Sequence, residues 1–247
     1  MMASAITMAS AALSPHDTHI LTTLFDPSAA PTPGPTITPS LPPDPHVPAS
    51  RLLSLRKRER EAISLVEAYE AKHREASQSR PSPPDRVATA SAALKLLDKL
   101  VADEPAYASA WNNRAQVRRW QWAGHPACPE RSTAMRAALA DCDTAISLAT
   151  PPPGGAVSPA QARVLAVAWT QRGAVVWEAA KRGGDGDGEE LGLEGDKVAL
   201  EEEGSRCFFM AGVYGGEVGR GMAVVANPHA RLCGGVVREA MRAELGF

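Results

Sequence analysis

Apolar residues recur every three or four positions along much of this 247-residue chain, a spacing that places them on one face of an α-helix. The first such run, over 14–25, opens with Ser14 as a candidate N-cap and ends at an Asp-Pro step. Its apolar face is formed by Ile20, Leu21, Leu24 and Phe25. A helix of about three turns is marginally stable alone, so we expect it to dock on another part of the chain or to fray.

The later helical runs fall into consecutive pairs, which span 51–107, 108–150 and 158–215. Arg56–Glu61, in the first pair, is interpreted as a solvated helix face with i,i+4 ion pairs. In the third pair, Ser158 followed by Pro159 and Gln161 combines an N-cap, a first-turn proline and a capping box. No segment shows strand-like alternation bounded by turn residues, so the pattern predicts an all-α fold.

A last helix is predicted over 227–245. Asn227 is its candidate N-cap, and Pro228 suits its first turn. Gly234 and Gly235 each weaken this helix by about 1 kcal/mol relative to alanine. Its formation therefore depends on packing, and we expect it to be a capping helix for the preceding pairs.

Proline interrupts the helical pattern near the N-terminus. Nine of the 22 residues from Pro27 to Pro48 are proline, and few of the others are apolar. Such a composition does not offset the entropy of ordering the chain. We therefore expect 26–50 to be a disordered or polyproline-II linker, and 1–13 to be disordered as well.

The helix pairs share a pattern of bulky and small residues at fixed positions. In the first helix of a pair, a bulky residue is followed four positions later by a small one: Trp111 and Ala115, then Trp169 and Gly173. In the second helix, small, large and small residues follow at matching spacing: Ala138, Cys142 and Ala145, then Gly204, Phe208 and Ala211. Small residues let two helices approach closely, so these positions are candidate packing contacts within each pair.

The turns within the pairs are enlarged. A standard tetratricopeptide repeat has about twelve residues between its two small positions, whereas this chain has 23 from Ala115 to Ala138 and 31 from Gly173 to Gly204. The largest insertion is an acidic loop at 183–196. Insertions confined to one equivalent turn suit a stack of helical hairpins, so the pattern predicts a tetratricopeptide α-solenoid of about three hairpins.

Four segments resemble the tetratricopeptide repeat protein 36 family, in the family's order. They are "HILTTLFDP", "PAYASAWNNRAQVRRWQ", "WTQRGAVVWEAAKRG" and "NPHARLCGGVVREAM". By these strings the chain is similar to a fungal-type member with enlarged loops. The resemblance implies a three-repeat interaction protein without catalytic activity, with chaperone-type partners and, in animals, a link to tyrosine metabolism.

The first helices of a tetratricopeptide stack line a concave groove, so the resemblance implies a set of groove-facing polar residues. They are Ser109, Asn112, Asn113, Gln116 and Arg119 of the central repeat and Gln171 of the third. An asparagine amide both donates and accepts, which suits a peptide backbone, and an arginine can hold a carboxylate through a forked pair. The alternatives are that the asparagines bond neighbouring helices and that Arg118 and Arg119 are solvated charges.

The two-carboxylate clamp of chaperone-binding repeats also needs cationic side chains in the flanking repeats. The corresponding positions are Ser64, Ala68, Val167 and Gln171, and none of them is basic. We therefore expect any chaperone contact to use another surface.

Composition and charge argue against several other classes of protein. A net charge of −2 gives no electrostatic reason to expect nucleic acid or an anionic membrane as a partner, and no apolar run reaches the ~18 residues of a membrane span. The four cysteines form no Cys-x-x-Cys motif, which favours free thiols in a reducing compartment. The N-terminus lacks the features of a signal or transit peptide, so we expect the cytoplasm, with the nucleus as an alternative.

Candidate metal and catalytic motifs are weak. The acidic "DGDGEE" at 185–190 has Glu190 where a calcium loop needs glycine. His16 with His19, and His125 with Cys128, lack the third and fourth ligands of a zinc site. No catalytic constellation or phosphate-binding loop is visible, so we expect no enzyme activity, metal or cofactor.

These patterns favour a protein-binding adaptor or co-chaperone-like module with a protein or peptide partner. The alternative is a structural subunit of an obligate assembly, with no free peptide groove. A further hypothesis is that the helix over 14–25 lies in the groove of its own chain.

Overall fold

The computed structural model describes residues 34–75, 83–182, 190–230, 242 and 244. Within these residues the chain is helical apart from one isolated β-bridge, which confirms the all-α prediction for the described part. The predictions for 1–13 and 14–25 lie outside it, as do 183–189 of the acidic loop and most of the helix predicted over 227–245. The elements below belong to one unit, residues 35–247.

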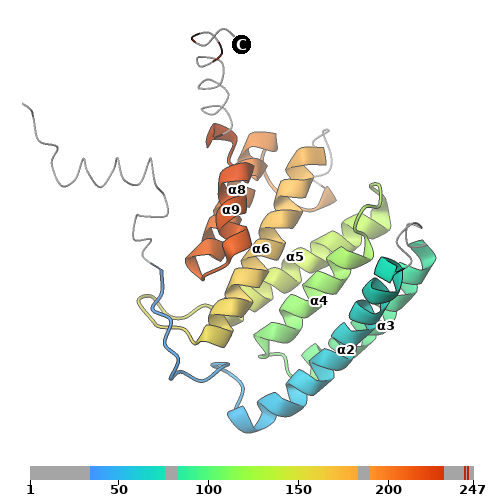
Figure 1. Ribbon diagram of the computed structural model, residues 1–247, viewed down its shortest axis with the longest axis vertical. Coiled ribbons are helices and arrows are strands. Elements are labelled where there is room, and N and C mark those ends of the chain that lie inside the picture. The colour runs from blue at the N-terminus through green and yellow to red at the C-terminus, as the bar shows by residue number, and fades with distance from the viewer. Residues whose placement is uncertain (1–33, 76–82, 183–189, 231–241, 243, 245–247) are drawn as a thin grey trace, which may run out of the picture. The chain divides into compact units, whose positions relative to one another are not determined.

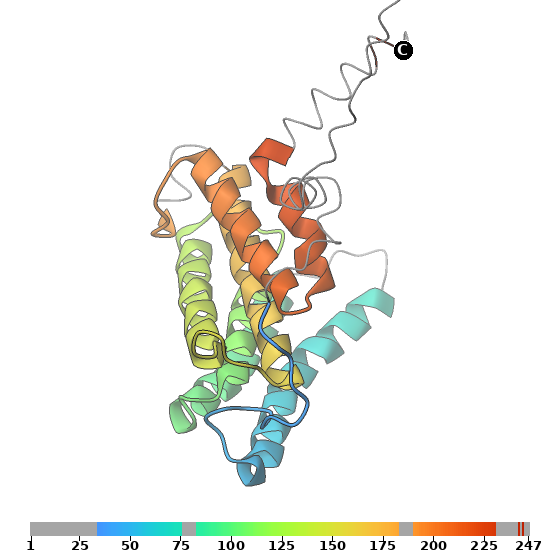
Figure 2. The same cartoon turned by 90° about the vertical axis from the view of Figure 1, so that its left-hand side faces the viewer.

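Each helix packs mainly against its neighbours in the chain (Figures 1 and 2). In chain order the helices are α2 (Ala49–Glu75), α3 (Pro83–Asp103), α4 (Ala108–Gln121), α5 (Pro129–Ala149), α6 (Pro159–Arg182), α8 (Lys197–Val213) and α9 (Glu217–Ala226). The closest contacts pair α2 with α3, α4 with α5, and α6 with α8, while α9 packs on α8. The three predicted pairs are therefore adjacent pairs in space.

The core of the first pair is continuous with the front of the second. Leu52 and Leu55 of α2 and Leu97 and Leu100 of α3 are buried together with Val117 of α4. Burial of each such aliphatic side chain stabilises the fold by about 1.5–3 kcal/mol. The charged positions of α2 alternate with this apolar face, which is why a helix of low overall hydrophobicity still packs.

Small residues lie where the paired helices meet. Ala115, Ala138 and Cys142 form one fully buried cluster between α4 and α5. At Gly173, an added Cβ would lie 3.0 Å from Cβ of Cys207 and 3.1 Å from the ring of Phe208, so α6 and α8 approach too closely for a larger residue. The remaining positions of the small-and-large pattern are buried or partly buried, namely Trp111, Ala145, Trp169, Gly204 and Ala211.

The proline-rich segment before α2 has a fixed structure over 34–48, so the prediction of a disordered linker is wrong there. The backbone of Thr36 and Thr38 bonds Val157 at 2.9 and 2.8 Å, and Ser158 Oγ donates to the Pro43 carbonyl at 3.3 Å. Asp44 Oδ1 accepts from the backbone N–H of two following residues. Proline already restricts the chain, so these few bonds offset the smaller entropy that remains.

The helix α9 was not predicted. Four glycines in and around it lower its intrinsic helix propensity. Packing explains its formation, because Cβ at Gly219 would lie 2.4 Å from Cβ of Ala211 and 2.8 Å from the Phe208 carbonyl oxygen. After α9, Asn227 Oδ1 accepts hydrogen bonds from the backbone N–H of His229 and Ala230, at 2.9 and 3.2 Å.

Candidate functional site

A groove of about 590 Å³ lies between α2, the N-terminal turns of α4 and α6, and the segment before α2. Its lining combines apolar and charged side chains. These are Pro43, Asp44, Leu52, Arg56, Glu59, Arg60, Ile63 and Glu67 from the segment and α2, Tyr107, Ser109 and Asn113 from α4 and its cap, and Ala160, Arg163 and Val164 from α6. Among the described residues, α3, α5 and α8 contribute nothing to the lining.

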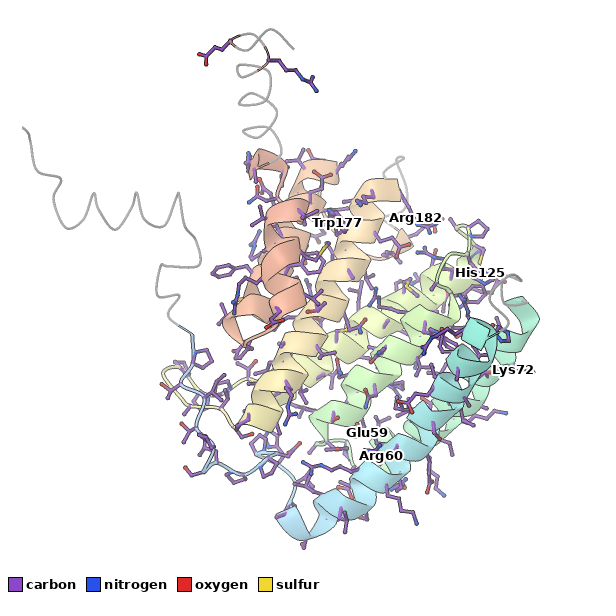
Figure 3. The ribbon with its side chains drawn as sticks, in the orientation of Figure 1. Glu59, Arg60, Lys72, His125, Trp177 and Arg182 are labelled. Carbon is purple, nitrogen blue, oxygen red and sulfur yellow. The ribbon has the colours of Figure 1, made fainter. Side chains whose placement is uncertain are left out.

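Glu59 is the centre of the polar contacts on this lining (Figure 3). Its Oε1 accepts from Ser109 Oγ and from Asn113 Nδ2, both at 2.6 Å. Its Oε2 accepts from the Tyr107 hydroxyl at 3.0 Å. The carboxylate of α2 thus takes three donors from α4 and its cap, and it joins the first pair to the second across the groove.

The Tyr107 hydroxyl is held in its neutral, donating form. Burial raises its pKa well above the usual range, and the neighbouring Glu59 carboxylate raises the pKa further. A neutral phenol donates its proton to Glu59, whereas a phenolate would repel it. The contact between Tyr107 and Glu59 is therefore stable over the physiological pH range.

The arginines of the groove differ from its carboxylates in their bonding. Arg56, Arg60 and Arg163 form no ion pair within the described part of the chain, and all three are exposed. Arg163 donates only its Nε, to the Pro159 carbonyl at 3.3 Å. Asp44 and Glu59, in contrast, already accept hydrogen bonds from the protein. The unsatisfied hydrogen-bonding capacity on this surface consists mainly of guanidinium donors.

The structure separates the predicted groove residues into two groups. Ser109 and Asn113 line the groove, although both donate to Glu59. Asn112 and Gln171 were wrongly placed in it, because both are buried and an amide oxygen of each lacks a hydrogen-bond partner in the described structure. Gln116 is exposed but lies outside the lining.

Arg119 is also outside the lining. It is half-buried on α4, and it forms no ion pair with any residue in the described ranges. Burial lowers its pKa, and the more distant Cys142 and Glu178 act in the opposite direction. The prediction that Arg119 holds a ligand carboxylate in the groove is not supported by its position.

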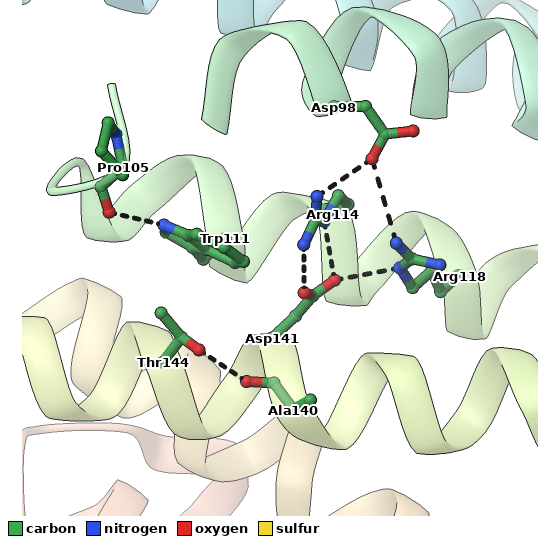
Figure 4. A network of polar contacts seen from close by, with 8 residues as sticks. All are labelled: Asp98, Pro105, Trp111, Arg114, Arg118, Ala140, Asp141 and Thr144. Atoms are coloured by element: carbon green, nitrogen blue, oxygen red, sulfur yellow. Dashed lines mark hydrogen bonds and ion pairs between the residues drawn. The ribbon is translucent and has the colours of Figure 1, made fainter. Parts of the chain in front are cut away.

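Arg118 is not a solvated charge. Its Nε donates to Asp141 at 3.0 Å, and Arg114 binds the same carboxylate and also Asp98 (Figure 4). The Arg114 guanidinium lies 4.6 Å from the ring centroid of Trp111. This network joins α3, α4 and α5, so the arginines that follow the two asparagines are structural.

The sequence analysis missed Glu59, Arg56, Arg60 and Arg163 as site residues. Two of the interpretations of Arg56–Glu61 were wrong in detail, since no i,i+4 ion pair forms there and Arg58 instead pairs with Asp103 of α3 at 2.6 Å. The available signal was helical spacing, because Arg56, Glu59, Ile63 and Glu67 recur at three or four residues. The partner elements across the groove could not be identified from that spacing alone.

Other chemical features of the described residues are few. No three His, Cys, Asp or Glu side chains in the described ranges gather as a metal site, and the helices there are not both long and apolar enough to cross a membrane. Cys128, Cys142 and Cys207 are free thiols. Burial raises the pKa of Cys142 to about 12 and also raises the pKa of Cys207, so neither is a ready nucleophile.

Comparison with known proteins gives one informative relative. The L-tyrosine degradation gene cluster protein hmgX of Aspergillus fumigatus is 35% identical to this chain over 254 residues, which cover 94% of this chain and 93% of the relative. The chain belongs to the hmgX family. No family model and no solved structure matches it.

Membership of the hmgX family corrects the resemblance to the tetratricopeptide repeat protein 36 family, which was wrong. The strings behind that resemblance coincide largely with helix contacts, such as those of Ala115 and Gly173. Small residues at such contacts meet a general need of closely packed helices, so they identify a family poorly. The relative's name refers to L-tyrosine degradation, the same area of metabolism that the resemblance implied.

Proposed function

We propose that this member of the hmgX family is a non-catalytic protein-binding module whose tetratricopeptide-type helix pairs present a groove to an extended peptide. The observation that carries the proposal is the origin of the lining. Its helical residues come from α2, α4 and α6, the first helix of each consecutive pair. In a solenoid of helical hairpins, the equivalent helices of successive repeats form such a concave surface.

The size and composition of the groove support a peptide ligand. A volume of about 590 Å³ is within the usual range of roughly 300–1,000 Å³ for ligand sites. Leu52, Ile63 and Val164 provide apolar contact, while Arg56 and Arg60 provide donors for carbonyl or carboxylate oxygens. The high pKa values of Cys142 and Cys207 are consistent with a role in binding instead of catalysis.

The test is to fill the groove and measure the selection of peptides from a random library of about ten residues. Ala160 lines the groove, so Ala160→Trp should abolish the enrichment seen with the wild type. Ala92 is exposed on α3, away from the lining, so Ala92→Trp is the matched control and should retain it. Equal enrichment with the two variants, or none with the wild type, would overturn the proposal.

We also extend to this chain the setting given in the relative's name. The partner is then a protein that takes part in L-tyrosine degradation, and the chain acts as an adaptor, with a chaperone as a second class of partner. A strain that lacks the gene should grow poorly with L-tyrosine as the nutrient. Wild-type chain and Ala92→Trp should restore growth, and Ala160→Trp should not.

A second candidate function is that of a structural subunit in an obligate assembly. It is favoured by exposed apolar side chains on α8 and α9, where Phe209 is 50% and Val218 is 68% exposed, with Val224 and Val225 nearby in the sequence. Light scattering on the purified chain separates the two functions. A monomer that selects peptides supports the adaptor, whereas a chain that is soluble only with a partner supports the subunit.

A further inference from the structure

We infer that the groove selects an acidic peptide segment, with Arg56, Arg60 and Arg163 as its ligand-binding residues and Glu59 as a fixed element of selectivity. This inference rests on the proposed function and specifies the chemistry of its ligand. It uses residues different from those that the sequence placed in the groove.

The first argument is the state of the donors on the lining. Tyr107, Ser109 and Asn113 already donate to Glu59, at 3.0, 2.6 and 2.6 Å. They therefore have little donating capacity left for a ligand. The three arginines, which lack ion pairs in the described structure, retain most of their five N–H donors each.

The second argument is the arrangement of the arginines. Arg56 and Arg60 are four residues apart on α2 and so share one helix face, and Arg163 comes from α6 on the same groove. Guanidinium groups bind carboxylates through paired, charge-assisted hydrogen bonds. An acidic side chain of an extended peptide can therefore contact both walls, which a neutral side chain cannot do with equal strength.

The third argument concerns the carboxylates of the lining. Asp44 and Glu59 are fixed by hydrogen bonds from the protein, so they do not neutralise the arginines through direct contact. Glu67 lies seven residues beyond Arg60 on α2, which is about 10 Å along the helix. The ligand should therefore place its acidic residue over the arginines and a neutral or basic residue towards Glu67.

The experiment measures fluorescence anisotropy of three labelled peptides of about ten residues, which differ only in a central pair of Glu, Gln or Lys. At low salt the full chain should bind the Glu peptide about three- to tenfold more tightly than the Gln peptide, as expected for partly exposed charge-assisted bonds. The Lys peptide should bind most weakly. The preference should decrease as salt is added, because salt screens exposed charges.

Variants assign the preference to the groove. Arg60→Gln and Arg163→Gln should each remove most of the advantage of the Glu peptide. Arg58→Gln is the matched control on the same helix, since Arg58 pairs with Asp103 of α3, and it should leave the advantage unchanged. Glu59→Gln removes a negative charge from the wall and should strengthen binding of the Glu peptide without changing the Gln peptide. Thermal melting confirms that each variant is folded.

The outcomes separate this inference from the function beneath it. Equal binding of the Glu and Gln peptides, with both lost in Ala160→Trp, would leave a peptide groove without acidic selectivity and so overturn the inference alone. The same loss in Arg58→Gln as in Arg60→Gln would also overturn it, since the effect would then come from general charge. Binding of none of the three peptides would overturn both proposals.

Discussion

Arg114 on α4 binds both carboxylate oxygens of Asp141 on α5, at 2.9 and 2.6 Å (Figure 4). Asp141 is only 3% exposed and also accepts from Arg118 at 3.0 Å. Loss of the carboxylate leaves two guanidiniums without their buried partner. We expect Asp141→Ala to lower the free energy of unfolding by about 3–5 kcal/mol, measured by urea denaturation.

Asp143 provides the control for this prediction, because it is exposed on the same helix and pairs with Arg172 at 2.8 Å. Asp143→Ala should cost about 1 kcal/mol or less, as is usual for exposed ion pairs. Equal losses in the two variants would show that burial of the Arg114–Asp141 pair does not set its importance.

Gly173 and Gly221 respond oppositely to the same substitution. At Gly173 a new Cβ meets Cys207 and Phe208 at 3.0–3.1 Å, whereas at Gly221 it meets nothing within 4 Å. We expect Gly173→Ala to destabilise the fold by about 1–3 kcal/mol through overpacking. Gly221→Ala should stabilise it by up to about 1 kcal/mol, because alanine favours the helix. Calorimetric melting of both variants checks the sign, and a stabilised Gly173→Ala would contradict the close contact of α6 with α8.

The buried thiol of Cys142 should resist alkylation. Since burial raises its pKa to about 12, only about one thiol in 10⁴ is ionised at pH 8, and the thiolate is the reactive form. Iodoacetamide labelling followed by peptide mass spectrometry should modify the half-buried Cys128 first, and Cys142 only after urea is added. Rapid native labelling of Cys142 would show that α4 and α5 separate.

The same shift makes the fold sensitive to high pH. The folded state favours the neutral thiol, so the contribution of Cys142 to stability is complete below the ordinary thiol pKa of about 9. That contribution is then lost as the pH rises towards about 12. We expect the free energy of unfolding to fall less steeply between pH 9 and 11 in Cys142→Ala than in the wild type.

Ser158 joins the start of α6 to the proline-rich segment. Its Oγ accepts from the Gln161 backbone N–H at 3.1 Å and donates to the Pro43 carbonyl at 3.3 Å. We expect Ser158→Ala to cost about 1–2 kcal/mol through loss of the helix cap, as measured by thermal or urea unfolding. Ser64 is an exposed serine inside α2 that bonds only its own helix, so Ser64→Ala should change stability by less than about 0.5 kcal/mol.

Local sequence rules predicted the parts of the fold that depend on neighbouring residues. Helical spacing located most of the helices, and the Ser158–Gln161 motif forms both of its reciprocal bonds, at 3.1 and 3.3 Å. The structure of 34–48 was missed because its partners, Val157 and Leu148, are more than 100 residues away. The helix α9 was missed because close packing on Ala211 outweighs its low helix propensity.

The candidate site was only partly predictable for the same reason. Ser109 and Asn113 were placed on the correct face of α4, but spacing could not show that Glu59 of another helix already bonds them. A charged run such as that around Arg60 is usually a solvated helix face, and only the position of α6 shows that Arg163 lies on the same groove. Asn112 adjoins Asn113 in sequence, yet the turn of the helix buries it.

The backbone pairing of Thr36 and Thr38 with Val157 closes a covalent ring that contains α2, α3, α4 and α5. In a linear array in which each member touches only its neighbours, terminal members open first and independently. Inside a closed ring, opening of α2 and α3 releases less chain entropy, because their ends stay tethered. Amide protons of the first pair should therefore exchange with deuterium almost as slowly as those at the start of α6, and the two regions should open as one cooperative unit.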